Sequence, residues 1–154
     1  KKNPTEIFGY NYSTVAWNEE RDTLAILNTV VFPKINMTED KKGNFLYLSV
    51  EKTAKQPQDY EKVKSYFEKN CKKVSLEDEE AGETYYENDN SFFKLTKKLN
   101  QIEEILGYDL KGNKDSKMVD VTEIRLEMYQ KEYLKKMEEL KIYSPGRIFW
   151  KKPN

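Results

Sequence analysis

Carboxylates, lysines and tyrosines are the side chains that could do chemistry in this chain, because its 154 residues include no histidine and a single cysteine. The absence of histidine excludes, within this chain, Ser-His-Asp and Cys-His catalysis and every metal site with an imidazole ligand. Cys71 has no second cysteine with which to form an internal disulfide. Its position on a stripe of apolar residues at helical spacing indicates a small buried side chain rather than a reactive thiol.

Two groups of carboxylates have a spacing that suggests metal chemistry. Asp109-Leu110-Lys111 has the acid-x-Lys form of a restriction-type nuclease, with Asp89 as a possible second acidic ligand. Residues 77–80 are four consecutive carboxylates, but they lack the ligand order and central glycine of an EF-hand, so we interpret them as a solvated loop. The alternative hypothesis is a hydrolase-type or nuclease-type enzyme, or a fragment of one, that uses carboxylate or metal chemistry, because acid–base catalysis needs only two well-placed carboxylates. They assign no catalytic, cofactor-binding or metal-binding residue.

The composition makes nucleic acid, a phosphate-bearing cofactor and a membrane span unlikely for this chain. The 27 basic and 27 acidic residues balance, which makes nucleic acid an unlikely partner because phosphate binding needs excess positive charge. The six glycines form no phosphate-binding motif, so we expect no cofactor. No apolar run approaches the roughly 20 residues of a membrane span.

Aromatic residues reach 13%, which favours a folded domain despite the high charge. Nothing in the sequence fixes the localisation or assigns a known family.

Apolar residues recur at steps of three and four in several stretches, which predicts amphipathic helices. The predicted helices cover residues 15–28, 59–71, 91–108 and 120–143. The last of these has Asp120 and Glu123 in a capping-box arrangement. The polar loop 109–117 is short enough for 91–108 and 120–143 to form an antiparallel helix pair.

The clearest predicted strand is 45–50, FLYLSV, which is short, apolar and aromatic. Shorter strands are predicted at 74–76, 84–87 and 147–150, and 34–44 is expected to be a polar loop. The sequence TYYE-NDN-SFFKL also fits a hairpin over 84–95, but the longer helical match favours a helix from residue 91. The predicted fold class is therefore α+β, with about four amphipathic helices and a small sheet of short strands.

The two ends of the chain are rich in aromatic residues, which anchor many protein interfaces. We expect one domain over 1–154 with an N-terminal arm at 1–13. The candidate interface residues are Phe8, Tyr10, Tyr12, Phe149 and Trp150. The leading hypothesis is a non-enzymatic protein-protein interaction module, or a structural subunit of a larger assembly, whose partner is another protein chain. Whether the chain is an enzyme is left open, and the absence of a catalytic motif favours a protein that is not.

Overall fold

A computed structural model describes residues 9–15, 26–76 and 79–139, with side chains over 26–76 and 79–136. Most of these residues are in strands. The elements in chain order are β1 (Gly9–Val15), β2 (Ile26–Leu27), β3 (Val30–Val31), β4 (Lys34–Asp40), β5 (Phe45–Ala54), α2 (Gln58–Asn70), β6 (Lys72–Val74), β7 (Glu83–Glu87), β8 (Ser91–Tyr108), β9 (Lys114–Gln130) and α3 (Lys131–Glu139).

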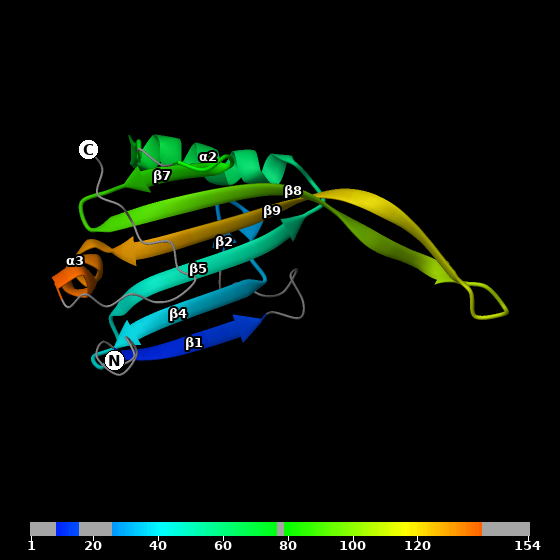
Figure 1. The fold of residues 1–154 in the computed structure, drawn as a ribbon, viewed down its shortest axis with the longest axis horizontal. Coiled ribbons are helices and arrows are strands. Elements are labelled where there is room, and N and C mark those ends of the chain that lie inside the picture. The colour runs from blue at the N-terminus through cyan, green and yellow to red at the C-terminus, as the bar shows by residue number, and fades with distance from the viewer. Residues whose placement is uncertain (1–8, 16–25, 77–78, 140–154) are drawn as a thin grey trace.

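Seven strands form one antiparallel sheet in the order β1-β4-β5-β9-β8-β7-β6 (Figure 1). The small β2–β3 hairpin lies outside this sheet. Strands β8 and β9 are much longer than their neighbours and extend as a two-stranded ribbon beyond the rest of the sheet (Figure 1). The molecule therefore has a body and one projecting hairpin.

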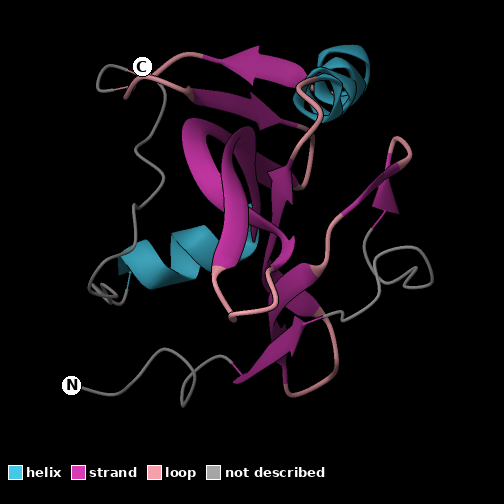
Figure 2. Cartoon of the chain, turned by 90° about the vertical axis from the view of Figure 1, so that its right-hand side faces the viewer, coloured by secondary structure: helices cyan, strands magenta, loops and turns pink. Residues whose placement is uncertain are grey.

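Helix α2 packs on one face of the sheet and supplies the centre of the core; Figure 2 shows it nearly end-on beside the twisted strands. Its buried residues Tyr60, Val63 and Phe67 follow helical spacing. The Phe67 ring stacks on Tyr86 from β7, with centroids 5.3 Å apart, and contacts Phe93 from β8 at 4.9 Å. The structure confirms the helix predicted over 59–71, and its packing explains why the amphipathic pattern is clear there.

The predicted α+β fold with about four amphipathic helices is wrong, because the described chain is mostly β and contains two helices. Residues 91–108 form the strand β8, and most of 120–143 that is described belongs to β9, followed by the short helix α3. In β9 the side chains of Ile124, Leu126 and Met128 point to the α2 side, and the residues between them are charged. This alternation is the period of a strand, and it competes with the helical spacing in the same segment.

Other predictions have mixed outcomes. The strand at 45–50 is confirmed and continues to Ala54 as β5. The polar loop expected over 34–44 is wrong for most of its length, because β4 occupies Lys34–Asp40. The hairpin over 84–95 is present as β7 and the start of β8. Of the helix predicted over 15–28, residues 16–25 lie outside the described chain, and Ile26–Leu27 is β2. The strand predicted at 147–150 also lies outside it.

Candidate functional site

The projecting end of the β8–β9 hairpin is the most distinctive feature of the molecule. β9 stays paired with β5 as far as Thr122, and β8 stays paired with β7 as far as Thr96. From Leu99 to the turn, the two strands pair with each other and with no other strand of the described chain. We call residues 99–121 the arm. With a rise of about 3.4 Å per residue, its nine residue levels from 100 to 108 extend about 30 Å from the body.

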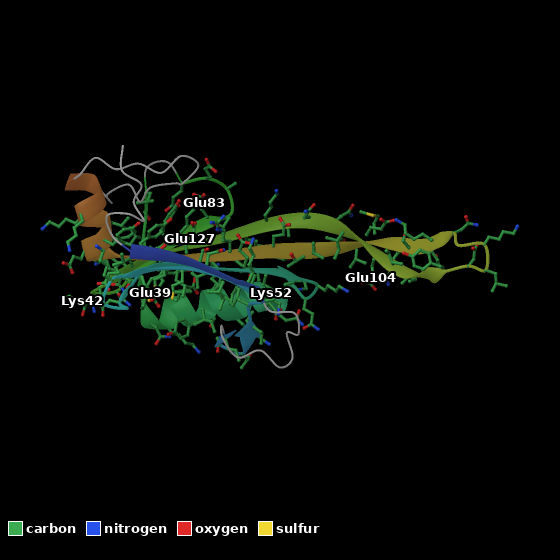
Figure 3. All side chains as sticks on the ribbon, turned by 90° about the horizontal axis from the view of Figure 1, so that it is seen from below. Glu39, Lys42, Lys52, Glu83, Glu104 and Glu127 are labelled. Carbon is green, nitrogen blue, oxygen red and sulfur yellow. The ribbon has the colours of Figure 1, made fainter. Side chains whose placement is uncertain are left out.

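The arm exposes large apolar side chains. Leu99 is 74% exposed, Tyr108 66% and Met118 61%. The full set in the arm is Leu99, Ile105, Leu106, Tyr108, Leu110 and Met118. Among the described residues, only Ile26 and Tyr66 are exposed large apolar side chains elsewhere. Exposed apolar surface is therefore concentrated on the arm, where Figure 3 shows side chains pointing away from both faces of the ribbon.

Exposed ion pairs link the two strands of the arm to each other and link the arm to the body. Lys114 Nζ lies 2.7 Å from a Glu103 oxygen across the two strands. Lys55 follows the end of β5, and its Nζ lies 2.6 Å from Glu104 Oε2, so one ion pair joins the body to the arm. Because these groups are solvent-exposed, their ion pairs are screened and contribute little stability. A free two-stranded hairpin is at best marginally stable in water.

The turn at the arm tip repeats a turn elsewhere in the molecule. Asp109-Leu110-Lys111-Gly112-Asn113 connects β8 to β9, and Asp40-Lys41-Lys42-Gly43-Asn44 connects β4 to β5. In both, the aspartate carboxylate accepts backbone N–H groups two and four residues later and the asparagine side-chain amide. In both, the glycine has a positive φ, at +82° and +84°. This is the type I turn plus left-handed residue of a three-residue hairpin loop.

The turns at 40–44 and 109–113, which we call the twin turns, differ only at their second residue, which is Leu110 in the arm. The β4–β5 turn carries Lys41 where the arm tip carries Leu110, and Leu110 is fully exposed. The turn geometry is reached with lysine, so it does not require leucine. The fold therefore does not account for an apolar side chain at the outermost point of the arm.

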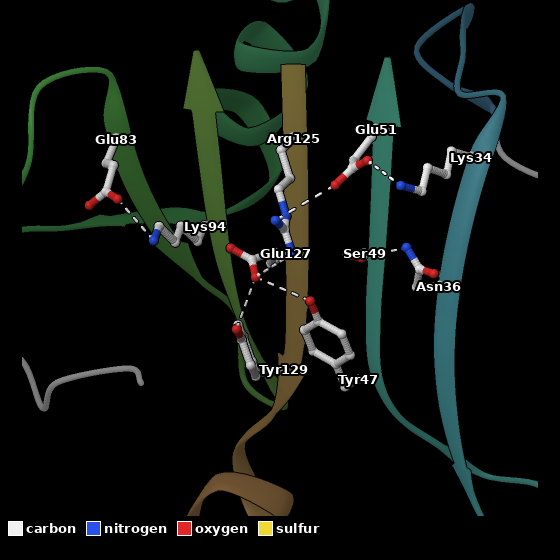
Figure 4. Close-up of polar contacts among 10 residues, drawn as sticks. All are labelled: Lys34, Asn36, Tyr47, Ser49, Glu51, Glu83, Lys94, Arg125, Glu127 and Tyr129. Carbon is white, nitrogen blue, oxygen red and sulfur yellow. Dashed lines mark hydrogen bonds and ion pairs between the residues drawn. The ribbon is translucent and has the colours of Figure 1, made fainter. Parts of the chain in front are cut away.

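A second candidate region is the polar face of the sheet, on the side away from α2 (Figures 3 and 4). Glu127 on β9 is only 9% exposed. Its Oε1 accepts hydrogen bonds from Tyr47 Oη at 3.1 Å and Tyr129 Oη at 3.2 Å, and lies 3.4 Å from Arg125 Nη2. Burial and the Glu127 charge together raise the pKa of Tyr47. The tyrosines are therefore donors that stabilise a buried carboxylate.

A neighbouring buried pair joins β7 to β8. Lys94 Nζ lies 2.9 Å from Glu83 Oε1, and both side chains are almost completely buried. The Tyr85 hydroxyl donates a hydrogen bond to Glu83. Burial opposes ionisation of Glu83, but the bonds from Tyr85 and Lys94 outweigh it and lower the carboxyl pKa. Burial and then the Glu83 charge raise the pKa of Tyr85.

The polar face is a compensated network. Its carboxylates Glu83 and Glu127 each have a cation and a tyrosine as partners. A hollow of about 540 Å³ opens beside it, next to Glu51 and Arg125, but neither Glu83 nor Glu127 lines this hollow. The two buried carboxylates thus lie away from the hollow, each beside its own cation and tyrosine. Their arrangement fits a structural role better than acid–base catalysis, which needs a carboxyl within reach of a substrate.

The structure does not bring the metal candidates together. Asp89 lies in the turn before β8 and Asp109 in the turn after it, and the 18 residues of β8 separate them by about 60 Å. The Asp109 carboxylate is occupied by its own turn, where bonds from Asn113 lower its pKa. The described residues contain no cluster of three or more metal-ligating side chains. Residues 77–78 of the acidic run are outside the described chain.

The interface residues expected from the sequence stay predictions. Tyr10 and Tyr12 are on β1, whose backbone pairs with β4, but their side chains are not described. Phe8, Phe149 and Trp150 lie outside the described residues. The sequence reasoning missed the arm, and one signal was available for it: the repeated D-x-K-G-N turn.

Comparison with known proteins gives no relative: no protein-family model, curated protein or solved structure matches this chain. Within the described residues, neither helix combines the length and apolar content that crossing a membrane requires.

Proposed function

We propose that this chain is a protein-protein interaction module or structural subunit of a larger assembly, and that the β8–β9 arm is its contact surface. The observation that carries the proposal is the concentration of exposed apolar side chains on the arm. Apolar surface gathered in one place on a soluble domain commonly marks a binding site. A partner would bury this surface and supply the packing that a two-stranded hairpin lacks.

The charge of the arm favours a protein as that partner. Residues 99–121 contain five carboxylates and three lysines, so the arm has a net charge of −2. A net negative arm repels nucleic acid phosphates and anionic lipid headgroups. A surface that combines apolar residues with charges of both signs fits a protein interface, where an apolar centre is surrounded by a polar rim.

The test removes the arm without disturbing the body. Val121 at the base of the arm is buried and is kept. Gln101 and Asp120 are directly opposite each other in the β8–β9 register, so an Asn-Gly turn can join them in place of residues 102–119. The full chain, expressed in its source cells, is expected to migrate in size-exclusion chromatography at a mass above that of the monomer. The arm-deleted chain is expected to migrate at its own mass, with its melting temperature nearly unchanged.

The matched control keeps the arm and changes a surface elsewhere: Ile26→Lys removes an exposed apolar side chain from β2. This variant is expected to retain the complex. A complex that survives arm deletion would contradict the proposal. So would a deletion that lowers the melting temperature of the body strongly, because the arm would then be needed for folding.

A further inference from the structure

A cleft of about 1110 Å³ lies at the end of the sheet opposite the arm. Its described walls are the β4–β5 turn, the β7–β8 turn, the end of β9 and the start of α3, with Phe45, Leu46 and Tyr133 as the apolar side chains. Figure 1 shows these elements at the left end of the body and the arm at the right. The molecule thus carries a projection at one end and a cleft at the other.

Phe45 is an aromatic residue of the cleft that lies outside the core clusters of the described residues. It is half-buried at the start of β5. Among the described residues it belongs to neither hydrophobic cluster, whereas Leu46 and Tyr133 belong to the smaller one. At the other end of the molecule, the apolar side chains of Tyr108 and Leu110 are exposed at the arm tip. Each end therefore presents an apolar group that lies outside the hydrophobic clusters of the described residues.

The charges of the two ends are complementary. The arm has five carboxylates and three lysines. The described lining of the cleft has four lysines and three carboxylates. Opposite net charges therefore suit a contact between the arm of one molecule and the cleft of another.

We propose that the occupant of the cleft is the arm of a second copy of this chain, with Leu110 inserted against Phe45 of the next molecule. This inference rests on the proposed function and names the partner. Donor and acceptor surfaces are different, so the contact is heterologous, and each molecule that donates an arm still has a cleft to fill. Such head-to-tail contacts build rings or open filaments rather than a self-limiting pair. The twin turns then have separate roles: the tip with Leu110 is the donor, and the turn with Lys41 is part of the acceptor wall.

The experiment uses two purified full-length variants, each with one defective surface. Leu110→Lys makes the tip turn match its twin and disables the donor. Phe45→Lys disables the acceptor and touches no described core cluster. Ile26→Lys is the control for adding a lysine at an exposed apolar site. Sedimentation equilibrium and light scattering are measured from about 1 μM to about 1 mM, a range that covers weak to moderate dissociation constants.

The wild type and Ile26→Lys are expected to grow in mass beyond the dimer as concentration rises, and each of the other variants is expected to stay monomeric alone. Mixing Leu110→Lys with Phe45→Lys is the decisive step, because the first has an intact cleft and the second an intact arm. The mixture is expected to form dimers and nothing larger. Circular dichroism checks folding, and the pair Leu110→Ser and Phe45→Ser replaces a variant that does not fold.

Three results would overturn the inference: a wild type that is monomeric at every concentration, a variant that self-associates as the wild type does, or a mixture that stays monomeric. Association of the wild type through an arm–arm contact gives a different pattern, in which Phe45→Lys alone still associates. The proposed function fails separately, when arm deletion leaves the complex from source cells intact. A monomeric pure chain whose complex nevertheless needs the arm would indicate a different protein partner.

Discussion

At the residue scale, the buried pair of Lys94 and Glu83 is where charge and burial conflict most strongly. Lys94 is 4% exposed, and its ammonium lies 2.9 Å from the Glu83 carboxylate. Burying two charges costs several kcal/mol per ion, which close pairing and further hydrogen bonds offset. Tyr85 supplies one such hydrogen bond. The pair contributes little net stability, but loss of either partner leaves an uncompensated charge in the sheet.

Lys94→Met tests this argument. It keeps the length of the apolar stem and removes the charge, so Glu83 loses its cation. We expect the free energy of unfolding in urea to fall by about 3–5 kcal/mol, as for other broken buried pairs. Lys34→Met is the control, because Lys34 is 47% exposed and its partner Glu51 is partly exposed; its cost should be below about 1 kcal/mol. Equal costs for the two variants would contradict the assignment of Lys94 as a buried partner.

The pH dependence of the same pair follows from Glu83. Its folded pKa lies below the reference value of 4.5, so its contribution to stability is full above the unfolded pKa and is lost as pH falls through the folded pKa. In Lys94→Met, burial acts unopposed by the lysine and raises that pKa. The stability difference between wild type and variant should therefore be largest near neutral pH and narrow as pH falls from the raised pKa of the variant to the lowered pKa of the wild type, a window that brackets the reference value of 4.5. Urea unfolding across pH 3–7 measures it, and a pH-independent difference would contradict the role of the Glu83 charge.

At the element scale, the sequence predicts some parts of this fold because their local and tertiary signals agree. In α2, helical spacing and burial against the sheet agree, so Tyr60, Val63 and Phe67 are correctly placed on one face. The strand at 45–50 has an apolar, aromatic composition that suits a central strand, and β5 is central. Neither prediction required knowledge of which distant segment of the chain packs against the element.

The helix predicted over residues 91–108 is wrong because helical spacing assumes that the apolar residues of a segment share one buried face. The apolar residues of β8 do not share one. Phe92, Leu95, Leu99, Ile102 and Leu106 fit one helical stripe, which assumes that they face one core. In the structure Leu95 is buried in the main core, whereas Leu99 and Leu106 are exposed on the arm. Spacing alone cannot distinguish apolar residues that pack in the core from apolar residues that stay exposed on the arm. The candidate site was missed for the same reason.

The twin turns give a prediction at this scale. Asp40 and Asp109 make the same bonds, but Asp40 closes a hairpin of the body and Asp109 closes the arm. Asp40→Ala should lower the melting temperature, because β4 and β5 are both in the main sheet. Asp109→Ala should leave the melting temperature unchanged and raise hydrogen exchange at the arm tip. If the two variants lowered the melting temperature equally, the arm would be thermodynamically coupled to the body.

At the scale of the whole molecule, arm and body should open separately although they share two strands. In the body, β8 and β9 lie between β7 and β5, and their inner side chains pack under α2. In the arm, the same strands pair only with each other within the described chain, and beyond Val121, which is buried at the base, no described side chain is fully buried. Local stability follows buried apolar contacts, so segments without them open at a small fraction of the global free energy.

Native-state hydrogen exchange on dilute protein should therefore show a boundary within each strand. Hydrogen-bonded amides of residues 91–96 and 123–129 should exchange near the global unfolding rate, and those of residues 100–108 and 114–121 should exchange far faster. The change in protection should fall near Leu99 and Thr122, where β9 leaves β5. Raising the protein concentration should protect the arm of the wild type and leave the arm of Leu110→Lys unprotected. Uniform protection along β8 and β9 in dilute protein would mean that the arm is stable without a partner, and the physical reason for expecting one would be lost.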